Sequence, residues 1–83
     1  NQIFKAGTSI GANVREAQNA ESKSDFIHKM KIAAKEADET EYWLLLCQKS
    51  ERLNSPPEKL ISDLKEIILI LSKIISSSKT RQG

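Results

Sequence analysis

The sequence predicts an all-α protein whose helices pack side by side and which self-associates. Its 83 residues include only three Gly, two Pro and one Val beside many Ala, Leu, Ile, Lys and Glu, a composition that favours helices over sheets. Three segments repeat apolar or small residues at alternating intervals of four and three, as expected of helices packed side by side. A domain this small buries only about 60% of its unfolded surface, so we expect a partner subunit to stabilise it.

The first predicted helix spans residues 2–20 and the second spans residues 24–53. The repeat in the first helix is Ile3, Gly7, Ile10, Val14 and Ala17. The repeat in the second helix is Phe26, Met30, Ala33, Ala37, Thr40, Leu44 and Cys47. Between the two, Ser22 and Asp25 form a capping box, in which the Ser22 hydroxyl accepts a hydrogen bond from a free N–H group of the helix start. The second helix is therefore expected to begin just after Ser22.

The third predicted helix spans residues 56–76, which completes a single domain over residues 1–76. Its repeat is Leu60, Leu64, Ile67, Leu71 and Ile74. We expect Ser55 to be its N-cap and Pro56 its first residue. The apolar run 67–71 covers the whole circumference of this helix, which predicts either self-association or a missing fourth helix. Residues 77–83 contain no apolar side chain, and we expect this tail to fray.

Two glycines four residues apart, Gly7 and Gly11, leave one face of the first helix without side chains. This spacing predicts close packing against the small residues Ala33, Ala34 and Ala37 of the second helix. A phosphate-binding loop is disfavoured, because the segment lacks both a GK[ST] ending and a preceding strand.

The composition also bears on the cellular compartment of the protein. The single Cys47 excludes an internal disulfide framework, and one Cys with one His cannot build a four-ligand structural zinc site. The longest strictly apolar run, residues 67–71, is far shorter than the ~20 residues that span a bilayer. We therefore expect a cytoplasmic protein without membrane contact. The chain starts inside a helical pattern and without Met, which predicts further sequence upstream.

No enzymatic activity and no cofactor are predicted. Asp25 and His28 have the carboxylate–histidine spacing of di-iron bundles, but such sites need a second copy of the motif and two more carboxylates. Cys47 continues the apolar repeat, which favours a small buried residue over a nucleophile. The acidic residues between positions 36 and 41 are distributed around the helix, so most of them are expected to face water.

The charges are distributed unevenly along the chain. Residues 1–35 carry a net charge of +3, residues 36–66 carry −4 and residues 67–83 carry +3, which sum to +2. A basic end on an otherwise neutral domain can contact phosphates. An ordinary solvated surface gives the same distribution of charges. The candidate nucleic-acid contacts are Lys5, Arg15, Lys23, Lys29, Lys31 and Lys35. No aromatic side chains alternate with them, so any binding would depend on charge or shape.

Polar residues also follow helical spacing. Ser9, Asn13 and Glu16 form a stripe on the first helix, and Glu36 lies beside the apolar stripe of the second. A hydrogen-bonded network between them would set the register of the two helices. The alternative is two independent solvated faces.

Several motifs of the chain resemble a known family. They are Gly7–Asn13, Arg15–Ala17, Glu21–Phe26, Lys35–Ala37 and Glu39–Leu44. Over roughly residues 2–75, the chain resembles the four-helix-bundle proteins encoded in intervening sequences of bacterial 23S ribosomal RNA genes. The resemblance implies an antiparallel up-down four-helix bundle that assembles into a homopentamer, with no known catalytic activity and a role in nucleic-acid binding. The three helices would correspond to the second, third and fourth of the family, without its first helix.

The resemblance extends to accessory proteins of diversity-generating retroelements, which partner a reverse transcriptase. It implies no catalytic role for any residue, so the shared motifs and the aromatic pair are structural or interface candidates: Ser9, Asn13, Glu16, Glu36, Glu41, Tyr42 and Trp43. We expect a non-enzymatic homo-oligomer that binds structured RNA or DNA through its basic surface. The alternative is a protein-interaction scaffold, in which Tyr42, Trp43 and the acidic stretch contact a reverse-transcriptase-type partner.

Overall fold

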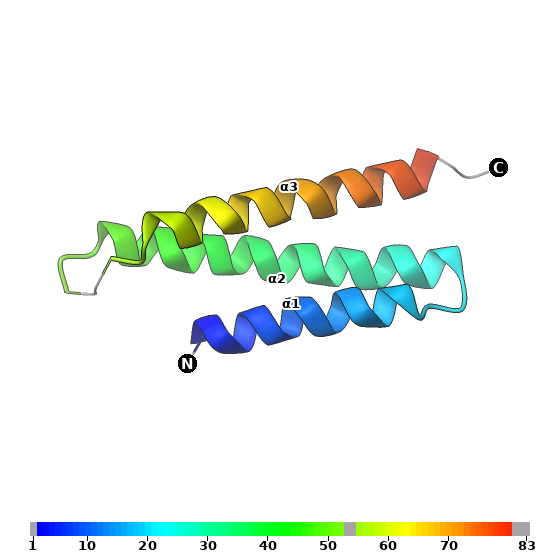
Figure 1. Ribbon diagram of the computed structural model, residues 1–83, viewed down its shortest axis with the longest axis horizontal. Helices are drawn as coiled ribbons and strands as arrows, with labels where there is room; N and C mark the ends of the chain where they lie inside the picture. The colour runs from blue at the N-terminus through cyan, green and yellow to red at the C-terminus, as the bar shows by residue number, and fades with distance from the viewer. Residues whose placement is uncertain (1, 53–54, 81–83) are drawn as a thin grey trace.

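The computed structural model describes residues 2–52 and 55–80, which form a three-helix, all-α arrangement (Figure 1). The helices are α1 (Gln2–Gln18), α2 (Lys23–Lys49) and α3 (Glu58–Thr80). They run in alternating directions along a body of 51 × 22 × 15 Å. Within the described residues, α1 and α3 each pack against α2, and the α-carbons of α1 and α3 stay more than 8 Å apart. The long central helix therefore holds the fold together, and the predicted antiparallel helical bundle is confirmed.

The predicted cap at the start of α2 is confirmed. Ser22 has extended backbone angles, φ −141° and ψ 160°, and its Oγ accepts a hydrogen bond from the N–H of Asp25 at 3.0 Å. The Asp25 carboxylate in the first turn adds a favourable interaction with the positive end of the helix. The preceding helix, α1, ends at Gln18, two residues earlier than predicted, where the N–H groups of Asn19 and Ala20 bond to the carbonyls three residues before them.

The bounds of α3 differ from the prediction at both ends. The carbonyl of Pro57 accepts hydrogen bonds from the N–H groups of Leu60 and Ile61, so Pro57, not Ser55, is the N-cap. The reason is steric, because a residue that precedes proline is disfavoured in helical conformation and Pro56 precedes Pro57. At the other end, α3 continues to Thr80, so residues 77–80 do not form the predicted frayed tail. Residues 81–83 lie outside the described part of the chain.

The end of α2 also precedes its predicted position. The helix stops at Lys49, and the N–H of Ser50 bonds to the carbonyl of Leu46 at 3.0 Å. Ser50 itself is extended, with φ −85° and ψ 133°. The predicted end at residue 53 falls outside the described residues.

The core lies along both sides of α2. It consists of Ala17, Met30, Ala33, Ala37, Leu44, Ile61, Leu64 and Leu71. Ala33 and Ala37 are completely buried, and their small side chains allow the neighbouring helices to approach α2 closely. Ile67, predicted in the core, is 41% exposed instead, because α3 buries only the stripe that faces α2.

The predicted contact of Gly7 and Gly11 with the alanines of α2 is wrong for this chain. Both glycines are exposed, and a Cβ atom added at either one would meet no other atom within 4 Å. The α1–α2 contact is made by a different face of α1, on which Ala17 is buried and Ile10 and Val14 pack against the core.

Candidate nucleic-acid interface

The six predicted cations lie on two helices and do not form one continuous patch. Lys5 and Arg15 project from α1, and the others project from α2. Five of the six are exposed, and Lys29 is half-buried. Two of the lysines are placed beside carboxylates, which leaves a smaller set of cations that can contact phosphate.

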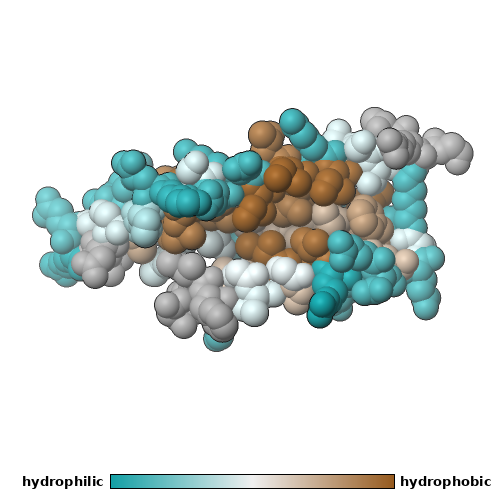
Figure 2. All heavy atoms as spheres, viewed as in Figure 1, coloured by the Kyte–Doolittle hydropathy of each residue, from teal (hydrophilic) through white to brown (hydrophobic). Residues whose placement is uncertain are grey.

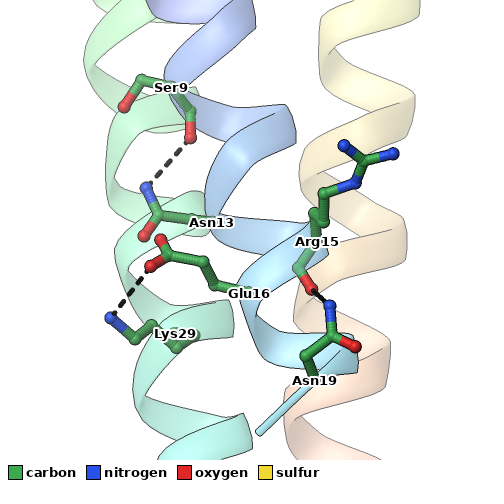
Figure 3. A network of polar contacts seen from close by, with 6 residues as sticks. All are labelled: Ser9, Asn13, Arg15, Glu16, Asn19 and Lys29. Atoms are coloured by element: carbon green, nitrogen blue, oxygen red, sulfur yellow. Dashed lines mark hydrogen bonds and ion pairs between the residues drawn. The ribbon is translucent and has the colours of Figure 1, made fainter.

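Lys29 is paired across the α1–α2 contact. Its Nζ lies 3.7 Å from Oε1 of Glu16 (Figure 3). Other polar contacts at this level stay within α1: Nδ2 of Asn13 donates to the carbonyl of Ser9 at 2.9 Å, and Nδ2 of Asn19 donates to the carbonyl of Arg15 at 3.1 Å. The ion pair partly neutralises Lys29. It does not involve Glu36, so the predicted network between Glu36 and the polar stripe of α1 stays a prediction.

Lys5 lies at an open cleft between α1 and α2 that is rich in carboxylates. The cleft has a volume of about 490 Å³ and is lined by Lys5, Ala6, Ser9, Glu36, Glu39, Thr40 and Trp43. It brings Ser9 of one predicted polar stripe together with Glu36 of the other. The Thr40 hydroxyl donates to the carbonyl of Glu36 at 2.7 Å, so this contact stays within α2. The charge of Lys5 is offset by its acidic neighbours.

The predicted aromatic pair splits between two environments. Trp43 forms part of the wall of the α1–α2 cleft and is 37% exposed, whereas Tyr42 is 66% exposed. Glu41 is half-buried beside them. Neither ring is in the core, so both remain interface candidates.

A second crevice, between α2 and α3, is basic. It has a volume of about 520 Å³ and is lined by Ser24, Ile27, His28, Lys31 and Lys79. No carboxylate is present among the described residues that line it. The pKa of Lys31 lies below its ordinary value of 10.5, because its neutral amine can accept a hydrogen bond from the Lys79 ammonium and its charged form is repelled by it, with a smaller contribution from desolvation.

Lys79 was missed as a site residue because the sequence after Ile75 was assigned to a frayed tail. The signal that could have placed it is helical spacing. Lys79 follows Ile75 by four residues and Leu71 by eight, and no Gly or Pro interrupts the segment between them. A continued helix therefore places Lys79 on the side of α3 that faces α2.

Lys35 extends this basic surface along α2. It follows Lys31 by four residues and His28 by seven, so the three share one side of the helix. Lys35, Lys31 and His28 are all exposed. Lys23 and Arg15 are exposed as well, and the structure does not bring them into the crevice. The basic cluster therefore consists of His28, Lys31 and Lys79 in the crevice and Lys35 beside it on α2.

An apolar groove runs between α1 and α3 over the surface of α2. It is lined by Gly7, Ile10, Thr40, Leu44, Leu60, Asp63, Leu64 and Ile67 and encloses about 170 Å³. Figure 2 shows hydrophobic side chains gathered over the middle of this face. Leu69 and Ile70 of α3 are also exposed. Exposed apolar side chains that gather around one groove are typical of an interface.

Metal binding, thiol chemistry and membrane insertion are further possibilities that the described residues allow to be compared with the structure. These residues contain no group of three or more His, Cys, Asp or Glu side chains placed to hold a metal ion. Asp25 and His28 thus stand without further ligands there, and the thiol of Cys47 is free and half-buried. None of the described helices combines the length and the hydropathy that crossing a bilayer requires.

Comparisons with known proteins show the family of the chain. No curated protein sequence matches it. Among solved structures, a protein of unknown function from the S23 ribosomal protein family of Bacteroides thetaiotaomicron VPI-5482 is 51% identical, with a TM-score of 0.80 over 89% of this chain and 69% of that chain. The family model of the 23S rRNA-intervening sequence protein matches residues 1–75. This match covers nearly the whole chain, and the chain belongs to the 23S rRNA-intervening sequence protein family.

Proposed function

We propose that this chain is a non-enzymatic, cytoplasmic subunit of a homo-oligomer, a pentamer as the family resemblance implies, that binds structured RNA or DNA through its basic surface. The observation that carries the proposal is the basic cluster of His28, Lys31, Lys35 and Lys79, which gathers basic side chains from two helices in and beside a crevice that no described carboxylate lines. A solvated helix surface commonly alternates charges of both signs, whereas a phosphate-binding surface concentrates positive charge.

Self-association supports this function by multiplying weak contacts. The apolar groove and the exposed Ile67, Leu69 and Ile70 give each subunit an apolar surface that a neighbouring subunit would cover. A closed ring repeats each basic cluster once per subunit. Contacts that are weak singly then act together on one nucleic acid, which raises avidity without new interactions.

The test is a charge reversal on the basic side of α2. We expect Lys31→Glu with Lys35→Glu to weaken the binding of structured RNA and to flatten its salt dependence. The slope of log K against log salt is negative, and each lost phosphate contact makes it less steep by about 0.7 to 0.9. Fluorescence anisotropy with a labelled RNA hairpin over a range of salt concentrations gives both quantities.

The matched control reverses two exposed lysines at the other end of the bundle. Lys49→Glu with Lys65→Glu changes the net charge equally but lies outside the basic crevice. If both double variants weaken binding equally, the effect comes from net charge and the assigned surface is wrong.

The exposed aromatic pair favours a second candidate function, a protein-interaction scaffold. Tyr42 and Trp43 lie next to Glu39 and Glu41, an arrangement suited to a partner that presents both apolar and basic groups. In that case Trp43→Ala would abolish binding to a purified reverse-transcriptase partner and leave RNA affinity unchanged. Isothermal titration calorimetry with both ligands separates the two functions, and retained partner binding by Trp43→Ala would count against the scaffold.

A further inference from the structure

The basic crevice is made by residues that the antiparallel packing brings together from distant parts of the chain. Figure 1 shows the end of α3 beside the start of α2, with α3 leaning away from α2 toward this end. Lys31 lies four residues after Ile27, which lines the crevice, and three before Ala34, which packs against the core. Lys79 lies four residues after Ile75, which also packs against the core. Both lysines therefore extend from the facing sides of the two helices into the same space.

The charges around the crevice are of one sign on the α3 side. Residues 67–83 contain no Asp or Glu, so α3 provides no carboxylate within its last fourteen residues, 67–80. On α2, the nearest acid is Asp25, which lies in the first turn beside the Ser22 cap and does not line the crevice. Glu16 of α1 is occupied by Lys29.

Two ammonium groups in contact repel each other unless an anion lies between them. The lowered pKa of Lys31 agrees with the closeness of the two side chains, since Lys79 is its principal cause, first through a hydrogen bond to the neutral amine and then through charge repulsion. An anion in the crevice would reverse the balance and favour both charged forms. The adjacent donors suit a tetrahedral oxyanion: His28 contributes an imidazole N–H, Ser24 contributes a hydroxyl, and the start of α2 contributes the positive end of its dipole.

We propose that His28, Lys31 and Lys79, with the hydroxyl of Ser24, form a binding site for one phosphate group of the bound nucleic acid. This inference rests on the proposed function for the source of its ligand, and the chemistry of the site is that of a phosphate oxyanion whichever molecule carries it. The start of α2 and the end of α3 would thus contact one phosphate group directly. Lys35 contributes positive charge from outside the crevice.

The first arm of the test uses inorganic phosphate as the probe and the full 83-residue chain. We expect phosphate to shift the ring resonances of His28 and the side-chain ammonium resonance of Lys31 in a saturable way, and chloride at equal ionic strength to leave them unchanged. Lys79→Gln should abolish the saturable shift. Lys73→Gln, which removes one exposed lysine from the same helix outside the crevice, should keep it.

Circular dichroism controls for folding, because Lys79 lies in the last turn of α3. If Lys79→Gln loses helix, Lys31→Gln takes its place, since Lys31 lies inside a long helix and is exposed. The proposal is overturned if a folded crevice variant binds phosphate as the wild type does, or if phosphate causes no saturable shift in the wild type.

The second arm separates this site from the proposed function as a whole. We expect Lys79→Gln to reduce the salt slope of RNA binding by about 0.7 to 0.9 for each crevice in contact, and Lys73→Gln to leave it unchanged. If the wild type binds no RNA, nucleic-acid binding fails and the phosphate site is judged by the first arm. If RNA binds and the two variants behave alike, the site fails while the function stands. RNAs with a 5′-phosphate and with a 5′-hydroxyl distinguish a terminal from a backbone phosphate.

Discussion

Leu44 provides the sharpest test of the packing around α2. It is the largest side chain that is fully buried among the described residues, with 1% of its surface exposed. Leu→Ala replacements in protein cores lower the free energy of unfolding by about 2–5 kcal/mol, depending on the cavity that remains. Leu44 also lines the apolar groove between α1 and α3, so the space left by Leu44→Ala would join an open groove instead of forming a closed void.

We therefore expect Leu44→Ala to lower the free energy of unfolding by about 2–3 kcal/mol, in the lower half of that range. For a chain of this size, each kcal/mol lowers Tm by about 4–8 °C. Leu46→Ala is the matched control, because Leu46 lies on the same helix and is 42% exposed. Its loss should stay within about 0.5 kcal/mol.

Urea unfolding followed by the far-ultraviolet circular dichroism of the helices measures both variants. Two protein concentrations separate a loss within the subunit from a loss of subunit association, because association depends on concentration. Equal losses for Leu44→Ala and Leu46→Ala at both concentrations would refute the assignment of the buried face of α2.

Three further predictions follow from local geometry. Ser22→Ala should lower the free energy of unfolding by about 1 kcal/mol, because it removes the acceptor of the Asp25 N–H, and Ser22→Thr should restore most of it in the same urea assay; an unchanged Ser22→Ala would contradict the cap. Gly11→Ala should raise the free energy of unfolding by about 0.5–1 kcal/mol, because alanine is the better helix residue and the added Cβ meets no atom within 4 Å. If a neighbouring subunit occupies that space, the variant should instead weaken the oligomer, which light scattering would show. The pKa of Lys31 is lower in the folded chain than in the unfolded chain, so the unfolded chain holds this proton more tightly. The free energy of unfolding should therefore rise as pH increases through the range below 10.5. This rise should disappear in Lys79→Gln, and identical pH profiles of stability for the wild type and the variant would contradict the contact between the two lysines.

The sequence predicted the helices and their order because their signals are local. Apolar spacing identified three helices, and the Ser22 hydroxyl at a fixed distance from Asp25 identified the start of α2. The start of α3 was misplaced because two effects compete there: Ser55 is a good cap, but consecutive prolines keep Pro56 out of the helix. Local rules predict a boundary well only where they agree.

The candidate site was harder to predict, because it depends on which faces of the helices meet. Lys31 and Lys35 were identified from spacing within one helix, but Lys79 required knowledge that α3 continues to Thr80 and packs antiparallel to α2. Spacing likewise could not show that Lys29 would pair with Glu16. Gly7 and Gly11 were assigned to the wrong contact for the same reason, since a stripe of small residues allows close approach without specifying the neighbour.

The central claim, binding of structured nucleic acid through a basic surface, is tested most directly by a salt titration. The affinity of the wild-type protein for a structured RNA and for a length-matched DNA duplex is measured from low to high salt, with the oligomeric state checked by light scattering in the same buffers. The account predicts that log K falls steeply and linearly with log salt, because each assembly neutralises several phosphates. Absence of binding at low salt by an intact oligomer would contradict it.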